Sequence, residues 1–462
     1  MNGDGLRELA RFAARTDVRT LPPEVVAKGK ACLLYAMAVG SACMRVKQPA
    51  QAAVATAGAG TGPATRFFDD AKCDAGLAAF ANGTLFHSRV QDDAHPAGHV
   101  GVVVIPAALA MAETVAADGA DLIAALVSGY ETALRIGRDH AADLSARGFR
   151  TTPTYGVFGA AAAAGRLLGF DERAMTHALA LAANMAGGLR EYSESGSEDF
   201  PFHAGTAAGN GIMAARLAAA GATSGPTALD GKAGFFRAYG EPGRDYAARL
   251  TADLGSVYEM LGVTYKPYPI CQFHRGIVRG CCLLRERAGS APLASVTVRM
   301  HPFEADFFGV RFAGPFTTFP QTFMSAPFCA ALAWARGDAT LAGLTDYRAE
   351  DVLALVPRIT IVADAGRPRY APRIEAHLRG GATLEWEERD AADAYLLTWD
   401  TACRMASVLS TEVGVAPADS QRLVAAVREL DGASTLANVV DAMRTACRAA
   451  AREPAASQHK DR

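Results

Sequence analysis

The stretch GVFGAAAAAGRLL, residues 156–168, decides the fold class of this chain, because a run of alanines between glycines continues an apolar helical pattern. The stretch AAGNGIMAARLAAAG at 207–221 has the same character. Small residues on helix surfaces allow neighbouring helices to approach closely. The two stretches therefore predict a tightly packed, all-α core.

Apolar residues at helical spacing extend this prediction toward both ends of the chain. Pro22 and Pro23 mark the start of one helix, and Asp118 with Gly119 forms a turn between two others. The predicted helices cover residues 25–40, 107–117, 122–137, 156–168, 172–188, 204–220, 403–412, 419–430 and 435–449. We expect a large all-α domain built from residues 1–264 and 399–455, followed by a polar tail at 456–462.

The pattern changes after Tyr265. ASVTVRM at 294–300 and RITIVA at 358–363 are rich in β-branched residues and read as strands. Residues 374–378 and 382–386 flank a Gly380–Gly381 pair, which is typical of a hairpin, and 321–336 reads as a helix. Residues 265–398 are therefore predicted to form a smaller α/β domain inserted into the helical one.

Composition excludes several functional classes. The 462 residues are 50% hydrophobic and 20% charged, the balance of a soluble globular protein of two or more domains. The net charge is −2 without a basic stripe, which argues against nucleic acid. The apolar runs are too short to cross a bilayer, and the N-terminus does not read as a secretion signal.

Cofactor and redox chemistry have no sequence signal either. Nine cysteines, an odd number without a CxxC pair, predict buried thiols in a cytoplasmic protein rather than disulfides or a zinc site. The chain has no P-loop, no G-x-S-x-G elbow, no HExxH and no Rossmann fingerprint after a predicted strand. We therefore expect no nucleotide or metal cofactor.

The segment NGTLFHSRVQDDAHPAGH at 82–99 gathers ionisable side chains in an otherwise apolar chain. Its glycines and proline predict a loop between helices. A carboxylate beside a histidine can orient the imidazole or act as a base, and of two adjacent aspartates only one is expected to face a given site. The alternative is a surface loop with turn residues only. The ionisable residues are His87, Asp92, Asp93, His95 and His99.

The segment KPYPICQFH at 266–274 lies at the predicted domain boundary. Its two prolines stiffen the chain around Lys266, Tyr268 and Cys271, and a cleft between domains is a favoured ligand site. Lys266 is well placed there to hold a substrate carboxylate. The alternative is a rigid linker. A Cys271–His274 nucleophilic pair is disfavoured, because no third group orients it.

The acidic segment GLREYSESGSEDFPFHAG at 188–205 interrupts two apolar helices. It either lines the same cleft, with Arg190, Glu191, Tyr192 or His203 pointing inward, or is a solvated loop in which His203 only caps a helix. Neither reading is preferred for His203, whereas the acidic run itself favours the solvated loop.

A further candidate is Arg150 in RGFRTTPTY, residues 147–155, directly before a helix rich in small residues. An arginine can bind a carboxylate with two parallel hydrogen bonds, and helix N-termini attract anions. The alternative is a surface arginine in a turn.

Taken in order, these motifs resemble the MmgE/PrpD family, which includes 2-methylcitrate dehydratases, cis-aconitate decarboxylases and iminodisuccinate epimerases. The resemblance implies a helical domain with a smaller α/β lid, a homodimer, and a metal-independent site between the domains. The implied chemistry is proton abstraction next to a carboxylate, followed by loss of water or carbon dioxide or by reprotonation. The motifs are NG…H…DD…HPAGH with IPAALAMAE, SGYETALRIG, GVFGAAAAAGRLLGF, PFHAGTAAGNGIMAARLAAAG and KPYPICQFH.

The resemblance also assigns roles to residues. The family's loop histidine matches His99, its aspartate pair matches Asp92 and Asp93, and its boundary lysine matches Lys266. Other family positions are changed: an aspartate, a threonine, a second histidine, a lysine, a lid tyrosine and a final boundary histidine. These are replaced here by Val90, Ala94, Arg150, Phe200, Phe328 and Arg275, the last with His274 one place early.

These replacements make the expected pocket less charged, and burying unpaired carboxylates is costly. The first hypothesis is therefore a lyase or isomerase for a larger or less charged acid, held by Arg150 and Lys266, with His99 and one aspartate moving the proton. The second is a standard family dehydratase or decarboxylase whose missing groups come from other residues. The third is a catalytically silent homologue that binds a ligand or partner. The residues considered as substitutes are His95, His203 and Tyr268.

Overall fold

The computed structural model describes residues 4–58 and 60–452, so the predicted tail at 456–462 lies outside the described residues. Within them the chain divides into two compact units. Of the described residues, the helical unit contains 4–58, 60–189, 201–264 and 397–452, and the mixed unit contains Arg190–Phe200 and Tyr265–Leu396. The sequence placed 190–200 with the helices, whereas the structure groups this segment with the mixed unit.

The centre of the helical unit is formed by α5 (Gly101–Thr114), α6 (Gly119–Gly137) and α8 (Thr151–Leu167), which pack against one another. Small residues are required where they meet: a Cβ added to Gly129 would lie 2.8 Å from the carbonyl oxygen of Gly159. The alanine- and glycine-rich stretches therefore allow the close helix packing that their composition predicts. The mainly helical character of the chain is confirmed.

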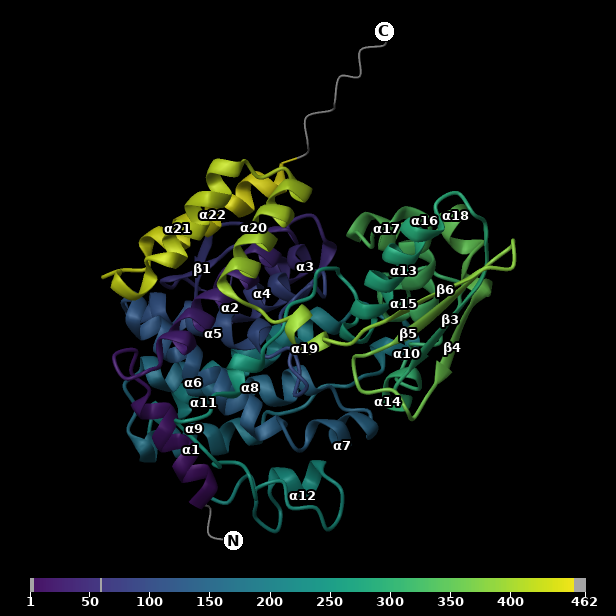
Figure 1. Ribbon diagram of the computed structural model, residues 1–462. Helices are drawn as coiled ribbons and strands as arrows, with labels where there is room; N and C mark the ends of the chain where they lie inside the picture. The colour runs from purple at the N-terminus through teal and green to yellow at the C-terminus, as the bar shows by residue number, and fades with distance from the viewer. Residues whose placement is uncertain (1–3, 59, 453–462) are drawn as a thin grey trace. The chain divides into compact units, whose positions relative to one another are not determined.

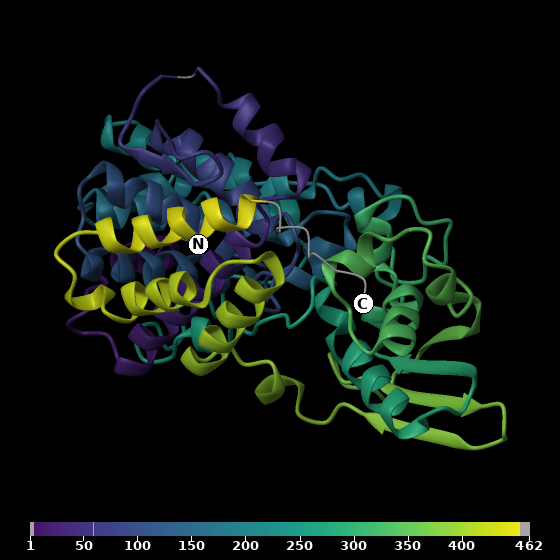
Figure 2. The ribbon, with the colours of Figure 1, turned by 90° about the horizontal axis from the view of Figure 1, so that it is seen from above.

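Helices from the N-terminal and C-terminal parts of the sequence pack together in the helical unit. Helix α2 (Pro23–Ser41), which begins with a proline as predicted, packs against α20 (Trp399–Val413), α21 (Pro417–Arg428) and α22 (Ala437–Ala451) (Figures 1 and 2). The other helices of this unit are α1 (Asp4–Arg15), α3 (Lys47–Ala55), α4 (Ala75–His87), α7 (Ala141–Ala146), α9 (Glu172–Ala183), α11 (Phe200–Ala219) and α12 (Phe235–Tyr239).

Two details of the prediction for this unit are wrong. The unit is not all-α, because β1 (Ala64–Arg66) and β2 (Ala71–Cys73) form a two-stranded antiparallel sheet. The segment 82–99 is also not a loop throughout, since residues 82–87 end α4. Asn82 connects this helix to the small sheet. Its side-chain amide donates to the Thr65 carbonyl at 2.8 Å and accepts from the Phe67 amide at 2.9 Å, and so holds β1.

The mixed unit contains a four-stranded sheet in the order β4–β3–β5–β6, with β3 and β4 parallel and the other pairs antiparallel. The strands are β3 (Leu293–Met300), β4 (Ile359–Ala363), β5 (Arg373–Leu378) and β6 (Thr383–Glu387). The predicted hairpin is confirmed, with Gly381 in the left-handed region at φ +87°. Helices α13 (Arg275–Ala288) and α16 (Ala326–Arg336) pack against the sheet (Figure 2).

The single helix predicted at 321–336 is two helices, α15 (Phe319–Met324) and α16. The chain is extended at Ser325, whose hydroxyl accepts a hydrogen bond from the Phe328 amide at 3.0 Å and caps α16. Pro327 sits in the first turn of α16, where its missing N–H costs nothing. The shorter helices of this unit are α10 (Tyr192–Ser195), α14 (Pro302–Ala305), α17 (Leu341–Thr345), α18 (Glu350–Leu353) and α19 (Ala391–Ala394).

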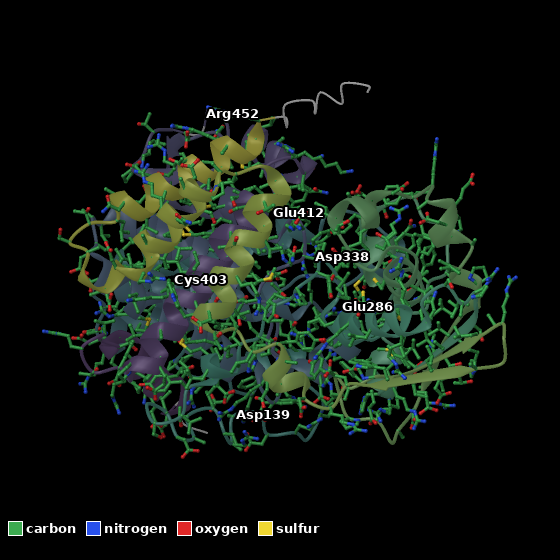
Figure 3. The ribbon with its side chains drawn as sticks, turned by 45° about the horizontal axis from the view of Figure 1, so that its top comes forward. Asp139, Glu286, Asp338, Cys403, Glu412 and Arg452 are labelled. Carbon is green, nitrogen blue, oxygen red and sulfur yellow. The ribbon has the colours of Figure 1, made fainter. Side chains whose placement is uncertain are left out.

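Two global expectations can be compared with the structure. In the described ranges, every helix is too short or too polar to traverse a bilayer. All nine cysteines are unbridged thiols, and all but Cys282 and Cys403 are buried, as predicted; Figure 3 labels Cys403.

Candidate active site

A buried carboxylate lies beside two imidazoles in the helical unit. The Asp92 Oδ2 atom is 3.2 Å from Nδ1 of His87 and 3.5 Å from Nδ1 of His99. His87 is the last residue of α4, while Asp92 and His99 belong to the segment that leads to α5. His87 and Asp92 are buried, and the His99 side chain keeps 18% of its surface exposed. The negative charge is thus shielded from water, next to a histidine that solvent still reaches.

The hydrogen bond at His99 Nδ1 defines the protonation of this ring. Nδ1 lies 2.8 Å from the carbonyl oxygen of Asp93. A carbonyl oxygen only accepts hydrogen bonds, so Nδ1 carries the hydrogen and, in the neutral ring, Nε2 carries the lone pair. The His99 amide also donates to Thr152 Oγ1 at 3.2 Å. Gly98 permits this approach, because it has φ +137° and an added Cβ would lie 2.9 Å from Thr151 Oγ1.

The two adjacent aspartates face different surroundings. The Asp93 carboxylate accepts a hydrogen bond from the Tyr130 hydroxyl on α6. Burial and the Asp93 charge together hold the pKa of Tyr130 well above its usual value. Burial lowers the pKa of Lys28, and the nearby Asp93 charge opposes that shift. Of the two aspartates, Asp92 has its carboxylate beside the rings of His87 and His99, and Asp93 accepts the hydrogen of His99 Nδ1 with its backbone carbonyl oxygen.

Arg150 holds two histidines at once. Its Nη2 donates to Nε2 of His87, and its Nη1 donates to Nδ1 of His203 at 3.2 Å. A guanidinium has donors only, so both imidazole nitrogens accept. The neutral His87 ring then carries its hydrogen on Nδ1, the atom that lies 3.2 Å from the Asp92 carboxylate. Arg150 is 3% exposed and precedes α8, where its amide donates to the Gly188 carbonyl at 2.9 Å.

These contacts form one polar network that runs from Arg150 through His87 and Asp92 to His99. The hydrogen bonds at His87 and His99 place a hydrogen on Nδ1 of each ring and, in the neutral His99 ring, the lone pair on Nε2. A neutral imidazole with a buried carboxylate beside it is suited to take a proton, because the carboxylate stabilises the imidazolium that forms.

Val90, in the turn that leads from α4 to this network, has an unusual backbone conformation. It is buried, and its φ of +57° lies in the left-handed region. Its amide donates to the His87 carbonyl at 3.1 Å, which closes the turn. A β-branched residue is costly in this conformation, by roughly 1–2 kcal/mol.

His95 lies in the same segment but has a different environment. Its Nδ1 accepts from the Ala97 amide at 3.2 Å, and its Nε2 is 3.8 Å from the Glu259 carboxylate. Burial lowers the pKa of His95 to about 4. The ring therefore shapes the turn at 95–98 and faces Glu259.

Three predicted polar residues of the mixed unit, Lys266, Cys271 and His274, are buried, whereas Tyr268 is half-buried. Burial lowers the pKa of His274 to about 3, its Nδ1 lies 3.2 Å from the Phe323 carbonyl, and its Nε2 has no partner within the described chain. Burial raises the pKa of the Cys271 thiol to about 11, which agrees with the prediction that it is no nucleophile. Burial likewise raises the pKa of Tyr268. Lys266 is fully buried.

The two replaced aromatic positions belong to the core of the mixed unit. Phe200 packs with its ring centroid 5.6 Å from that of Tyr192 and 5.4 Å from that of Phe323. Phe328 lies 4.7 Å from Phe316. Both side chains are at most 1% exposed. The structure shows both rings in aromatic packing, and their expected place in the substrate pocket stays a prediction.

Comparison with known proteins now places the chain. A model described as the MmgE/PrpD N-terminal domain matches residues 7–246, more than half of the sequence. The chain belongs to the MmgE/PrpD family. The predicted resemblance is confirmed. The matched range contains the whole network from His87 to His203, and Lys266 lies beyond it.

Curated relatives of this MmgE/PrpD protein include human cis-aconitate decarboxylase, 33% identical over 202 residues, which are 42% of this chain and 40% of the relative. A cis-aconitate decarboxylase-like protein of Aspergillus oryzae is 31% identical over 227 residues, 47% of each chain. Cis-aconitate decarboxylase of Aspergillus terreus is 29% identical over 223 residues, 46% of this chain and 45% of the relative. The chain thus spans less than half the length of the curated relatives it matches.

Three residues of the network were not assigned roles from the sequence. His87 stood in the quoted segment, but its position at the end of a helix was not expected. Tyr130 and Thr152 lie on α6 and α8, and they meet the 92–99 segment only through tertiary packing. The Tyr130 residue is part of the SGYETALRIG motif of this MmgE/PrpD protein, yet no local pattern pairs it with Asp93.

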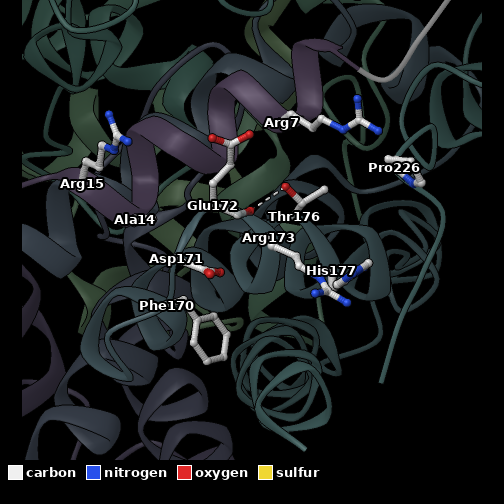
Figure 4. Close-up of a pocket in the computed structure, with 10 residues that line it drawn as sticks. All are labelled: Arg7, Ala14, Arg15, Phe170, Asp171, Glu172, Arg173, Thr176, His177 and Pro226. Carbon is white, nitrogen blue, oxygen red and sulfur yellow. Dashed lines mark hydrogen bonds between the residues drawn. The ribbon is translucent and has the colours of Figure 1, made fainter. Parts of the chain in front are cut away.

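A separate hollow of about 520 Å³ lies on the helical unit, where residues of α1 and α9 line it (Figure 4). Its acidic groups are engaged: Asp171 caps α9 by accepting from the Ala174 amide at 2.8 Å, and Glu172 pairs with Arg11 at 2.7 Å. The lining residues that the structure describes include none of the predicted site residues. The network around His99 therefore remains the candidate active site of the MmgE/PrpD protein.

Proposed function

We propose that this protein is an enzyme that abstracts a proton next to a carboxylate of an organic acid, and then releases carbon dioxide or water or returns the proton. The observation that supports this most directly is the His99 ring, with Nδ1–H on the Asp93 carbonyl at 2.8 Å and the Asp92 carboxylate at 3.5 Å. Membership of the MmgE/PrpD family and the names of the relatives favour the same reaction class.

The proton is taken by Nε2 of His99. The C–H electron pair moves toward the adjacent carboxylate group, and the positive charge that appears on the imidazole is stabilised by Asp92. In a dehydration, this pair forms a carbon–carbon double bond, and the neighbouring hydroxyl takes the proton back from the imidazolium and leaves as water. In a decarboxylation, the imidazolium first returns its proton to the carbanion, at the same or an allylic carbon; the C–C bond to the carboxylate then breaks, and the electron pair that stays on carbon takes a proton from water as carbon dioxide leaves. In an isomerisation, the proton returns to the opposite face.

The main role proposed for Arg150 is to orient the two histidines. Its bonds to His87 and His203 use one N–H on each terminal nitrogen, and a guanidinium has five N–H groups in all. Binding of a substrate carboxylate by Arg150 and by Lys266, as the sequence suggests, stays a prediction.

The substrate is proposed to be a less charged or larger acid than citrate-type metabolites. Val90 is buried and apolar two residues before Asp92, and Arg150 already serves two histidines. A polyanion needs more cationic partners than this, because buried unpaired carboxylates are costly. The alternative substrates are cis-aconitate, which the names of the relatives favour, and 2-methylcitrate.

Deuterium uptake tests the proposal. The full chain is incubated in D₂O with a panel of acids, from monocarboxylic acids to cis-aconitate and 2-methylcitrate, and NMR follows deuterium at carbon, alkene formation and carbon dioxide release. We expect exchange with an acid of lower charge. Fast turnover of cis-aconitate or 2-methylcitrate would contradict the proposed specificity. Saturable binding of an acid without any exchange would instead show a catalytically silent homologue.

The proposal includes a small-molecule acid as ligand and a cytoplasmic location. It also includes a homodimer, which the family resemblance suggests. Light scattering of the purified full chain measures its mass in solution. A value near twice the 48.2 kDa of one chain is expected, and a value near one chain would contradict the dimer.

A further inference from the structure

Lys28 is a buried lysine on α2 with two backbone partners. Its side chain is part of a residue only 6% exposed, and Nζ donates to the carbonyl oxygens of Val263 at 2.6 Å and Leu397 at 2.7 Å. A lysine is seldom buried so far without a specific reason. Both acceptors lie where the chain leaves the helical unit after Thr264 and re-enters it at Leu397. Lys28 therefore fixes these two ends against α2.

The segment held by Lys28 is paired with the 92–99 segment, which contains His99. The Leu397 amide donates to the Val263 carbonyl at 3.1 Å. The next residue, Thr264, exchanges both backbone hydrogen bonds with Ala94, each at 2.8 Å, and its Oγ1 donates to the Ala94 carbonyl at 2.9 Å. Ala94 directly follows Asp93, whose carbonyl oxygen accepts the hydrogen of His99 Nδ1.

We propose that Lys28 is a positioning residue for the reaction: by holding Val263 and Leu397 it fixes the Thr264–Ala94 pairing, and through it the Asp93 carbonyl that orients His99. This inference rests on the proposed function of His99 as the base. Lys28 is proposed to act through the backbone that it holds, without contact to the substrate.

The contacts predict an effect on catalysis rather than on binding. Without the ammonium, the carbonyl of Leu397 loses its donor and that of Val263 keeps only the Leu397 amide, so the paired segment gains freedom. A misplacement of about 1 Å at a reacting group can cost about 10²-fold in rate. Arg150 is held separately, by the Gly188 carbonyl and by two histidines. Its position is independent of the Thr264–Ala94 pairing.

The test compares Lys28→Met with Lys30→Met in the full chain. Lys30 is a matched control on the same helix, since its Nζ also donates to a backbone carbonyl, that of Arg428 at 2.8 Å, and pairs with Asp431 at 2.5 Å. We expect Lys28→Met to lower kcat by about 10²-fold with a nearly unchanged KM. Amide hydrogen exchange is expected to rise in peptides covering 92–99 and 262–266. Lys30→Met changes neither.

Two further variants keep the inference falsifiable if Lys28→Met does not fold. Lys28→Arg retains donors and is expected to restore part of kcat. Thr264→Val removes the hydroxyl bond to Ala94 and keeps the backbone pairing, and is expected to lower kcat by about threefold to tenfold, the size of one neutral hydrogen bond.

The possible results distinguish a failure of the positioning role of Lys28 from a failure of the proposed function. Unchanged exchange at 92–99 in Lys28→Met overturns the positioning role whatever the activity. Raised exchange with an unchanged kcat also overturns it, and leaves the proposed function intact. A wild-type chain that exchanges deuterium with no acid refutes the proposed function, and the positioning role falls with it.

Discussion

Replacing Asp92 with asparagine tests the network at its central charge. The variant keeps the shape of the side chain and removes one negative charge, which lies 3.5 Å from His99 Nδ1. At this distance, and with an effective dielectric constant of about 20, a carboxylate stabilises an imidazolium by about 5 kcal/mol. The amide oxygen retains part of this interaction, and each 1.4 kcal/mol is worth about tenfold in rate. We therefore expect kcat to fall by about a thousandfold.

The matched control is Asp93→Asn, which removes the same charge one residue further along. Its carboxylate contacts Tyr130 rather than a histidine ring, so we expect a loss of about tenfold only. The assay is the initial rate of deuterium incorporation into the acid that the wild type exchanges, with circular dichroism as a check of folding. The reasoning is refuted if Asp92→Asn stays within tenfold of the wild type, or if Asp93→Asn is the more damaging change.

Three further outcomes are expected. Arg150→Lys lowers kcat/KM by about 10²-fold in steady-state assays, because a single ammonium cannot reproduce the planar contact with two histidines. An unchanged kcat/KM would contradict the proposal that Arg150 orients them. Val90→Asp fits the left-handed backbone better than valine but adds a buried negative charge, so it is expected to lower the turnover of cis-aconitate more than that of less charged acids; a relative rise for cis-aconitate would count against the specificity argument. Burial lowers the pKa of His274 from 6.5 to about 3, so only the unfolded chain takes up this proton below about pH 6.5. The stability that the neutral ring contributes is complete above that pH and is lost as the pH falls toward 3. Urea denaturation is expected to show the wild type losing about 1.4 kcal/mol more per pH unit than His274→Phe between about pH 6 and pH 4; parallel pH profiles would show that the ring is not buried neutral.

Much of the fold could be predicted because it depends on local patterns. Alanine and glycine at helical spacing predicted the helices around α8, Asp118 marked the boundary before α6, and paired glycines marked the hairpin between β5 and β6. Breaks that depend on detailed backbone choices were missed. The extended residue Ser325 divides one predicted helix, and Asn82 acts from inside a helix where the glycines and proline of its segment had predicted a loop.

The candidate site could be predicted only in part, because residue types mark chemistry but not direction. The sequence singled out Asp92, Asp93 and His99. The different surroundings of the two aspartates, however, depend on Tyr130, which is 37 residues from Asp93 in the chain. His95 looked equivalent to its neighbours, but its ring faces Glu259. Such differences arise from tertiary packing, which periodicity and spacing do not encode.

The central claim is that Nε2 of His99 takes the proton. The most direct measurement is deuterium incorporation by His99→Asn, whose side-chain amide can still donate to the Asp93 carbonyl, with binding of the same acid measured by calorimetry. The account predicts loss of exchange by at least about a thousandfold, within the range of a general base, while the acid still binds. Exchange at a rate close to that of the wild type would contradict it.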